Sequence, residues 1–141
     1  MRFILICALT FGFSQQTLSE DSLTDETEQI RETISNYFNG VRLSDERLLE
    51  TAFDVNSGHM KGFLIEENKE TIVTSKPIKE VIQTWIAKEK RPEMNGRILS
   101  IEIFGSAATV TFDFDNKYLD FFHLVRTKSG WKIINKFYIY K

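Results

Sequence analysis

Two kinds of hydrophobic periodicity divide the chain into a helical half and a strand-rich half. In residues 25–53 and 78–86, apolar residues recur at intervals of three and four, the spacing that gives a helix one apolar face. From residue 96 onward, apolar and polar residues alternate, as they do in strands with one buried face. Residues 58–73 fit a strand, a polar turn and a second short strand. The pattern predicts a helix pair, two strands, a third helix and four further strands.

Three turns set the predicted register of the last four strands. Gly105-Ser106 and Asn116-Lys117 fit two-residue hairpin loops, and Lys128–Gly130 fits a loop that ends in a left-handed glycine. These turns place His123 opposite Asn135. Because side chains alternate faces, one face then carries Leu99, Ile101, Ile103, Ala108, Val110, Phe112, Phe114, Leu119, Phe121, His123, Val125, Trp131, Ile133, Asn135 and Phe137. We interpret this face as the core face, and it holds no Asp or Glu.

His123 and Asn135 are the only polar residues on the predicted core face. A buried imidazole beside an amide can act as a general base or orient a ligand carbonyl, or the two groups can simply satisfy each other. His123 is the candidate catalytic residue, and the candidate ligand-binding residues are Asn135, Tyr37, Trp85, Phe121, Trp131 and Phe137. His59 and His123 lie far apart in the sequence, so no metal site is predicted. No phosphate loop or dinucleotide fingerprint is present, so no cofactor is predicted.

The opposite predicted face mixes apolar and charged residues. It includes Phe122, Leu124, Ile134 and Tyr138. A half-apolar sheet face is typical of a partner surface, and sheet-to-sheet pairing in a homodimer would bury it. The alternatives are a surface for another protein and scattered surface aromatics.

The N-terminal residues carry a different signal. Arg2 precedes an apolar run from Phe3 to Phe13, which is too short to span a bilayer and fits a secretory signal peptide; the alternative is a buried strand. We predict a signal peptide at 1–14, a polar tail at 15–24 and one domain at 25–141, in a bacterial protein that is periplasmic or secreted, with no membrane span in the mature chain. Cys7 is the only cysteine, so the mature chain would hold no disulfide. The net charge of −2 argues against nucleic-acid binding.

The order of these elements resembles the nuclear transport factor 2-like superfamily. Three segments, "IRETISNYFNGVRLSDERLLETAF", "NGRILSIEIFGSAATVTFDF" and "DFFHLVRTKSGWKIINKFY", are similar to its putative lumazine-binding (SnoaL-like) branch, and the resemblance runs from Glu28 to Tyr138. It implies an α+β, cone-shaped fold in which three helices from the N-terminal half pack on a curved, mainly antiparallel sheet around a cavity, often in a dimer. The branch name does not assign a pterin or flavin ligand.

These observations predict a small exported domain that binds a small apolar or heteroaromatic ligand or acts as a dimeric scaffold. One alternative is a polyketide-cyclase-like isomerase, dehydratase or hydrolase with His123 as general base. Another is a protein-interaction module that uses the opposite sheet face. Similar folds that isomerise ketosteroids or polyketides place a carboxylate or tyrosine in the cavity. The predicted core face lacks an acid, which weighs against the enzyme and leaves catalysis undecided.

Overall fold

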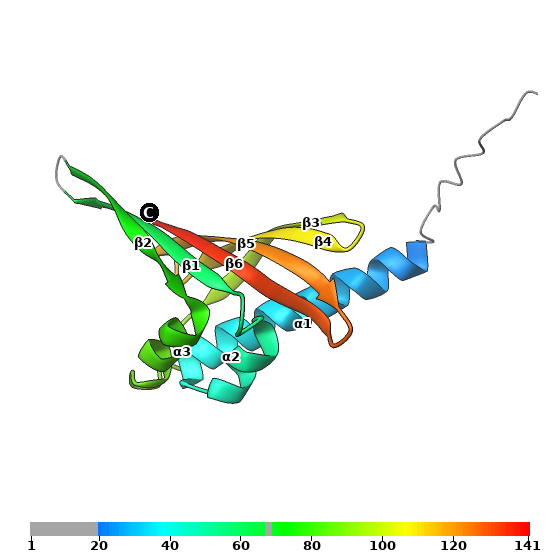
Figure 1. The fold of residues 1–141 in the computed structure, drawn as a ribbon, viewed down its shortest axis with the longest axis horizontal. Coiled ribbons are helices and arrows are strands. Elements are labelled where there is room, and N and C mark those ends of the chain that lie inside the picture. The colour runs from blue at the N-terminus through cyan, green and yellow to red at the C-terminus, as the bar shows by residue number, and fades with distance from the viewer. Residues whose placement is uncertain (1–19, 67–68) are drawn as a thin grey trace, which may run out of the picture.

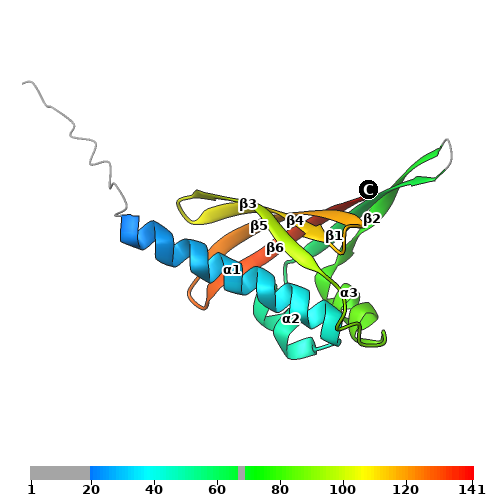
Figure 2. The ribbon, with the colours of Figure 1, turned by 180° about the vertical axis from the view of Figure 1, so that it is seen from behind.

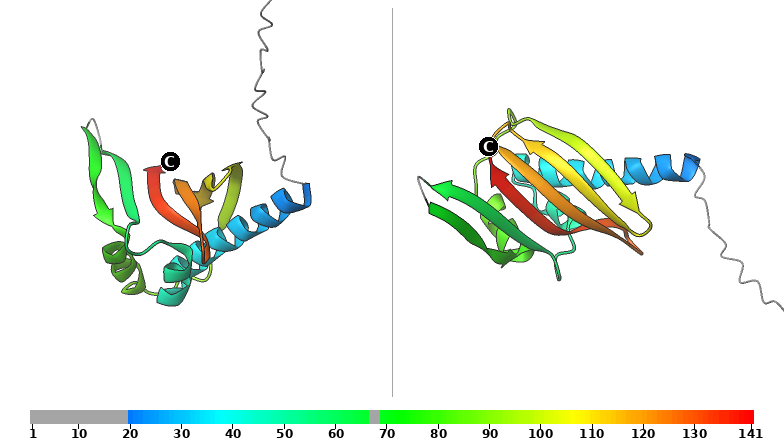
Figure 3. Two further views of the ribbon diagram at one scale, coloured as in Figure 1. Left: turned by 45° about the vertical axis from the view of Figure 1, so that its right-hand side comes forward. Right: turned by 90° about the horizontal axis from the view of Figure 1, so that it is seen from above.

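Helices cover one side of a sheet in the computed structural model of the chain, which describes residues 20–66 and 69–141 (Figures 1 and 2). The described elements are α1 (Glu20–Leu43), α2 (Glu46–Ala52), β1 (His59–Glu66), β2 (Lys69–Pro77), α3 (Ile78–Ile86), β3 (Gly96–Phe104), β4 (Ala107–Phe114), β5 (Tyr118–Thr127) and β6 (Gly130–Tyr140). The strand order across the sheet is β2-β1-β6-β5-β4-β3 (Figure 3), and only β1 and β6 pair in parallel. The predicted α+β fold class is confirmed.

Helix α1 begins at Glu20, inside the segment predicted as a polar tail, and the Thr24 hydroxyl donates to the Glu20 carbonyl at 3.0 Å within the helix. It continues through Gly40, where a Cβ atom would lie 2.6 Å from Leu49 Cγ. Glycine at this position therefore lets α1 and α2 pack closely. The predicted signal peptide lies outside the described residues and stays a prediction, which N-terminal sequencing of the mature protein can check.

The turn between β4 and β5 differs from the predicted one by one residue. Asp115 and Asn116 both adopt the left-handed conformation, with φ of 56° and 53°, and the Lys117 N–H donates to the Phe114 carbonyl at 3.1 Å. Asp and Asn tolerate this conformation better than most residues. Phe114 consequently pairs with Tyr118 instead of Leu119. A shift of one residue reverses the face of every side chain in β5.

The register of β5 with β6 is correct at the predicted pair but not along the whole ladder. His123 does pair with Asn135, but the register shifts next to it, so that Leu124 pairs with Ile133 and Ile134 is the extra residue of a bulge. Trp131 and Ile133 therefore face the core as predicted, and both are buried. Beyond the bulge, Asn135 and Phe137 lie on the opposite face. The predicted placement of His123 and Asn135 on the core face is wrong.

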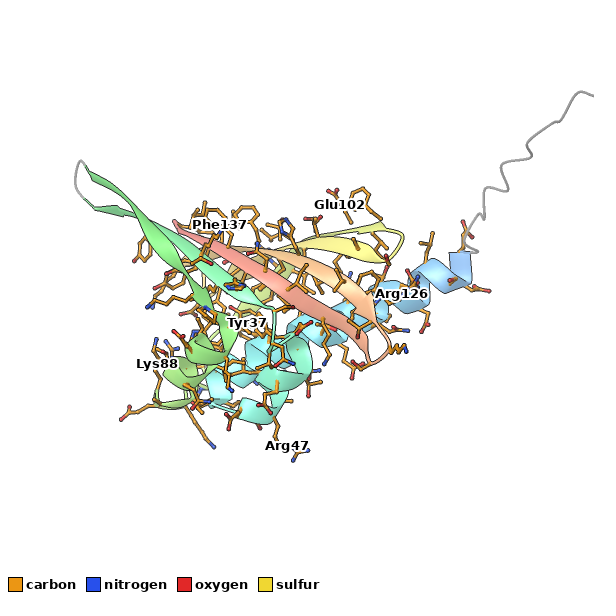
Figure 4. All side chains as sticks on the ribbon, viewed as in Figure 1. Tyr37, Arg47, Lys88, Glu102, Arg126 and Phe137 are labelled. Atoms are coloured by element: carbon orange, nitrogen blue, oxygen red, sulfur yellow. The ribbon has the colours of Figure 1, made fainter. Side chains whose placement is uncertain are left out.

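The core lies between the helices and the inner face of β4, β5 and β6. Phe122 and Leu124 are both 1% exposed, so these two residues belong to the core and not to the predicted partner surface. The face away from the helices carries Phe121 and Phe137, whose ring centroids are 5.9 Å apart. Figure 4 shows Phe137 pointing away from the helices. An apolar outer face is thus present, but with different residues from those predicted.

The register predicts unequal costs for truncating two neighbouring phenylalanines. Phe122→Ala should lower the free energy of unfolding by about 3–5 kcal/mol, because it empties a buried ring site. Phe121→Ala should lower it by about 1 kcal/mol, because this ring is only half-buried. Urea unfolding of both variants measures the difference, and similar costs would contradict the observed register.

The predicted homodimer can be tested on the same outer face. If two copies pair through it, Phe121→Lys should give monomers in sedimentation experiments while the circular dichroism spectrum stays unchanged. A wild-type chain that is monomeric at high concentration would argue against the dimer.

Candidate functional site

A pocket of about 290 Å³ opens between α3 and the sheet, at the end where β1, β5 and β6 meet the loop of residues 87–95. Its apolar wall is formed by Tyr37, Val41, Met60, Val81, Trp85, Met94, Phe114 and Tyr118. Ionisable side chains also line it, including Asp120 and Lys136 on the sheet. The combination of an apolar wall with a few polar groups is typical of small-molecule sites.

The sheet side of the pocket holds a buried three-residue network. Tyr37 Oη donates to Asp120 Oδ2 at 2.7 Å, and Lys136 Nζ donates to Asp120 Oδ1 at 2.6 Å. Asp120 is 1% exposed and Lys136 is 4% exposed, so the ion pair is removed from bulk solvent. We call these residues the Tyr37–Asp120–Lys136 network. It joins α1 to two neighbouring strands at the pocket.

Each member of the network is positioned by its own element. Tyr37 lies on the buried side of α1, where its ring makes edge contacts with Phe122 at 5.0 Å and Trp85 at 5.8 Å between centroids. Asp120 faces inward because the β4–β5 turn sets the alternation of β5, and Lys136 faces inward because the bulge at Ile134 sets that of β6. The turn and the bulge thus place the carboxylate and the ammonium opposite each other.

Burial controls the protonation of this network. Burial lowers the pKa of Lys136, while the negative charge of Asp120 and its hydrogen bond oppose that change. Burial, followed by the charge of Asp120, raises the pKa of Tyr37 well above its ordinary value. The Tyr37 hydroxyl therefore stays protonated and remains a donor to the carboxylate.

Aromatic rings surround the Lys136 ammonium. Its Nζ lies 4.7 Å from the centre of the Tyr138 ring and 5.8 Å from that of Tyr37, distances at which ring and cation attract. Tyr138 lies over Gly62, its partner on β1, where a Cβ atom would be 2.2 Å from Tyr138 Cζ. Gly62 thus leaves the space that the Tyr138 ring fills. Burial also raises the pKa of Tyr138, so this second hydroxyl stays protonated at neutral pH.

The comparison with protein families assigns the chain. Residues 25–139 match the family described as "Putative lumazine-binding". The chain belongs to this family. No curated protein matches it.

Solved structures of other proteins have the same fold as this chain. A nuclear transport factor 2-like protein of unknown function from Shewanella baltica is 25% identical, with a TM-score of 0.69 over 84% of this chain and 95% of that one. One from Methylobacillus flagellatus is 22% identical, with a TM-score of 0.71 over 89% and 96%. A putative dehydratase of the same superfamily, from Streptomyces avermitilis, is 12% identical, with a TM-score of 0.59 over 84% and 97%. The predicted superfamily and branch are both confirmed.

The structure brings together two of the residues that the sequence proposed for the site. Tyr37 and Trp85 line the pocket. Trp131 is buried in the core away from the pocket lining, and Phe121 and Phe137 lie on the outer face. Asn135 Nδ2 lies 3.3 Å from His123 Nδ1, also on the outer face, where the His123 side chain is exposed. The binding roles of these residues stay predictions, but the geometry places five of them outside the pocket.

Sequence reasoning missed Asp120 and Lys136. Both were assigned to the outer face by the predicted register, and the statement that the core face lacks a carboxylate is wrong, because Asp120 is buried there. The local signal that could have found them is "FDFDNKYLD", in which Asp115 and Asn116 tolerate the left-handed conformation and a three-residue loop, Asp115–Lys117, pairs Phe114 with Tyr118.

The described residues hold two further negative findings. In the ranges 20–66 and 69–141, no helix has the length and apolar character needed to cross a membrane. Among the same residues, no group of three or more His, Cys, Asp or Glu side chains is arranged to hold a metal ion.

The buried ion pair predicts an asymmetric pattern of mutant stabilities. Lys136→Met should lower the free energy of unfolding by about 3–5 kcal/mol, because it leaves the Asp120 carboxylate buried without its cation. The double variant Asp120→Leu/Lys136→Met should recover most of this loss, because both charges are then gone. Chemical denaturation of the variants measures the effect. If the double variant loses as much unfolding free energy as Asp120→Leu and Lys136→Met lose together as single variants, the two groups do not act as a pair.

Proposed function

We propose that this domain binds a small aromatic or heteroaromatic molecule in the pocket, with a polar atom of the ligand accepting a hydrogen bond from Lys136. An ammonium group has three N–H donors, and one of them is directed to Asp120. No second hydrogen bond of Lys136 Nζ is found within the described residues, so two donors remain for a ligand. This donor beside the pocket's aromatic wall is the observation that carries the proposal.

The size and wall of the pocket define the ligand further. A volume of about 290 Å³ lies near the lower end of the range of small-molecule sites, roughly 300–1,000 Å³. One- or two-ring compounds match this volume better than extended chains or fused four-ring systems. Trp85 and Tyr118 offer ring surfaces on the wall. Lumazine, which the family description names, is a two-ring heteroaromatic compound with carbonyl acceptors and therefore belongs among the compounds to test.

Calorimetric titration tests the proposal with three probes: lumazine, 6-hydroxy-2-naphthamide and 2-naphthamide. The two naphthamides differ only in a ring hydroxyl, whose oxygen can accept a hydrogen bond from the Lys136 ammonium. The hydroxyl compound should bind about tenfold more tightly, the size expected for a hydrogen bond to a charged group. The Asp120→Leu/Lys136→Met variant should abolish this difference. No heat of binding with any of the three probes would contradict the proposal.

A blocking variant distinguishes the pocket from other apolar surfaces. Thr84 lies on α3 and lines the pocket, so Thr84→Trp should fill it and abolish binding. Lys79 lies on the same helix, is exposed and does not line the pocket, so Lys79→Trp is the matched control. Equal loss of binding in both variants would place the ligand elsewhere.

A proton-transfer enzyme is the second candidate, favoured by the buried carboxylate beside Lys136. Asp120 could take a proton from the carbon next to a carbonyl group, while Lys136 donates a hydrogen bond to the enolate oxygen. The lowered pKa of Lys136 makes its ammonium a stronger acid and hence a better donor. The putative dehydratase from Streptomyces avermitilis shares the fold, and dehydration often begins with this type of proton removal. Asp120 and Lys136 here replace the His123 base of the sequence-based alternative.

Deuterium exchange of 2-tetralone in heavy water tests this second candidate. The wild-type chain should exchange the protons next to the ketone faster than buffer alone, as followed by proton NMR. Asp120→Asn should abolish the excess rate, whereas Asp113→Asn should preserve it, because Asp113 is a sheet carboxylate that does not line the pocket. An exchange rate equal to that of buffer would leave ligand binding as the function.

A further inference from the structure

The pocket is lined by more positive than negative charge. Its cationic residues are Lys76, Lys88, Arg91, Lys117 and Lys136, and its acidic residues are Asp115 and Asp120. The whole chain has the opposite balance, with a net charge of −2. Positive charge is therefore concentrated at the pocket, where it favours a negatively charged ligand.

Both acids of the pocket already have partners. Asp120 accepts from Tyr37 and Lys136, and Asp115 lies 3.6 Å from the Lys117 ammonium. The other three cations have no ion pair within the part of the chain that the structure describes. These three, Lys76, Lys88 and Arg91, are called the rim cations here. Their charge is not offset by any acid of the pocket.

Arg91 is the most informative of the rim cations. Its Nε is buried and has no hydrogen-bond partner among the described residues. Buried donors in folded proteins are nearly always paired, so this Nε–H is available to donate a hydrogen bond to a ligand in the pocket. Lys88 follows the C-terminus of α3, where a positive charge also stabilises the helix. That structural role accounts for Lys88 but not for the unpaired Nε of Arg91.

Hydrogen bonds hold the loop that carries Lys88 and Arg91 against the C-terminal end of α1 and the residue that follows it. The Ser44 hydroxyl donates to the Lys88 carbonyl at 2.7 Å, and the Arg91 N–H donates to the Arg42 carbonyl at 2.7 Å. Arg42 Nη1 in turn donates to the Pro92 carbonyl at 2.8 Å. The backbone of the two rim cations is thus fixed before a ligand arrives, which reduces the entropy lost on binding.

We propose that Arg91 and Lys88 bind the carboxylate of an aromatic acid whose rings occupy the pocket. This inference rests on the proposed function and adds the charge of the ligand. A guanidinium presents planar N–H donors that match a carboxylate, and one of these donors is the unpaired Nε. The rings of the acid contact the apolar wall, and its far end faces Lys136. The ligand class is therefore an aromatic carboxylic acid with a polar substituent away from the carboxylate.

Calorimetric titration with 6-hydroxy-2-naphthoate and 6-hydroxy-2-naphthamide tests the proposal. The two probes have the same rings and hydroxyl, but only the first carries a charge. At low ionic strength the carboxylate should bind about tenfold more tightly than the amide. This preference should shrink as salt is added, because Lys88 is exposed to solvent and its attraction for the carboxylate is screened by salt. The binding of the neutral amide should change little with salt.

Charge-removing variants locate the carboxylate. Arg91→Gln and Lys88→Gln should each reduce the ratio of the affinities for the carboxylate and the amide probe. The double variant should bring this ratio close to one. Lys90→Gln is the matched control, because Lys90 is exposed in the same loop and does not line the pocket. Thermal unfolding confirms that each variant is folded before titration, and the salt dependence of the wild-type chain gives a second readout that needs no variant.

The possible outcomes separate this inference from the proposed function. Equal binding of both probes would overturn the inference and leave the proposed function standing. A preference that survives the double variant would also overturn it, because the carboxylate would then bind elsewhere, for example at Lys136. If neither probe binds, the inference fails, and if lumazine also gives no heat of binding, the proposed function fails as well. A preference that is lost in the double variant and kept in Lys90→Gln supports the inference.

Discussion

The ion pair between Asp120 and Lys136 is the interaction on which the pocket depends. It is buried, it connects β5 to β6, and through Tyr37 it connects both strands to α1. Two charges in a core are stable only when each has its partner and its hydrogen bonds. The positions of α1, β5 and β6 around the pocket are therefore coupled, since a displacement of β5 or β6 would leave a buried charge unpaired and a displacement of α1 would remove a hydrogen bond from the buried carboxylate.

Side-chain alternation explains which parts of this structure could be predicted from the sequence. The helix pair, the third helix and the strands were predicted from hydrophobic periodicity, which averages over many residues. The inner face of β4 was also correct, because the Gly105-Ser106 turn was identified correctly and Ile101 pairs with Val110. The face of β5 depended on the length of the loop: a two-residue loop at Asn116-Lys117 pairs Phe114 with Leu119, whereas the three-residue loop Asp115–Lys117 pairs Phe114 with Tyr118. Both loops contain turn-forming residues, and the apolar pattern of "YLDFFHLV" fits either face.

The site could not be predicted because two local irregularities determine it. Phe121 and Phe122 are equally apolar, as are Leu124 and Val125, so hydrophobicity does not decide which of each pair is buried. The β4–β5 turn reverses the predicted faces of the β5 side chains, and the bulge at Ile134 reverses those of the second half of β6. The pairing of His123 with Asn135 was therefore right while the face was wrong. Asp120 and Lys136, predicted on the outer face, lie on the core face, whereas His123 and Asn135 lie on the outer face. The polar pair in the core is therefore an ion pair and not an imidazole–amide pair.

A buried ion pair is weak evidence for stability, and this bears on the role of the network. Well-packed apolar residues of similar volume often stabilise a core as well as a buried ion pair or better. The fold alone therefore does not require Asp120 and Lys136. What the pair provides, and apolar residues could not, is a fixed set of donors at the wall of an aromatic pocket. The unpaired Nε of Arg91, which lines the same pocket, fits this interpretation, because it too lacks a structural partner within the described residues. Asp120, Lys136 and Arg91 thus place polar groups that the fold does not require at one pocket, where a ligand can use them.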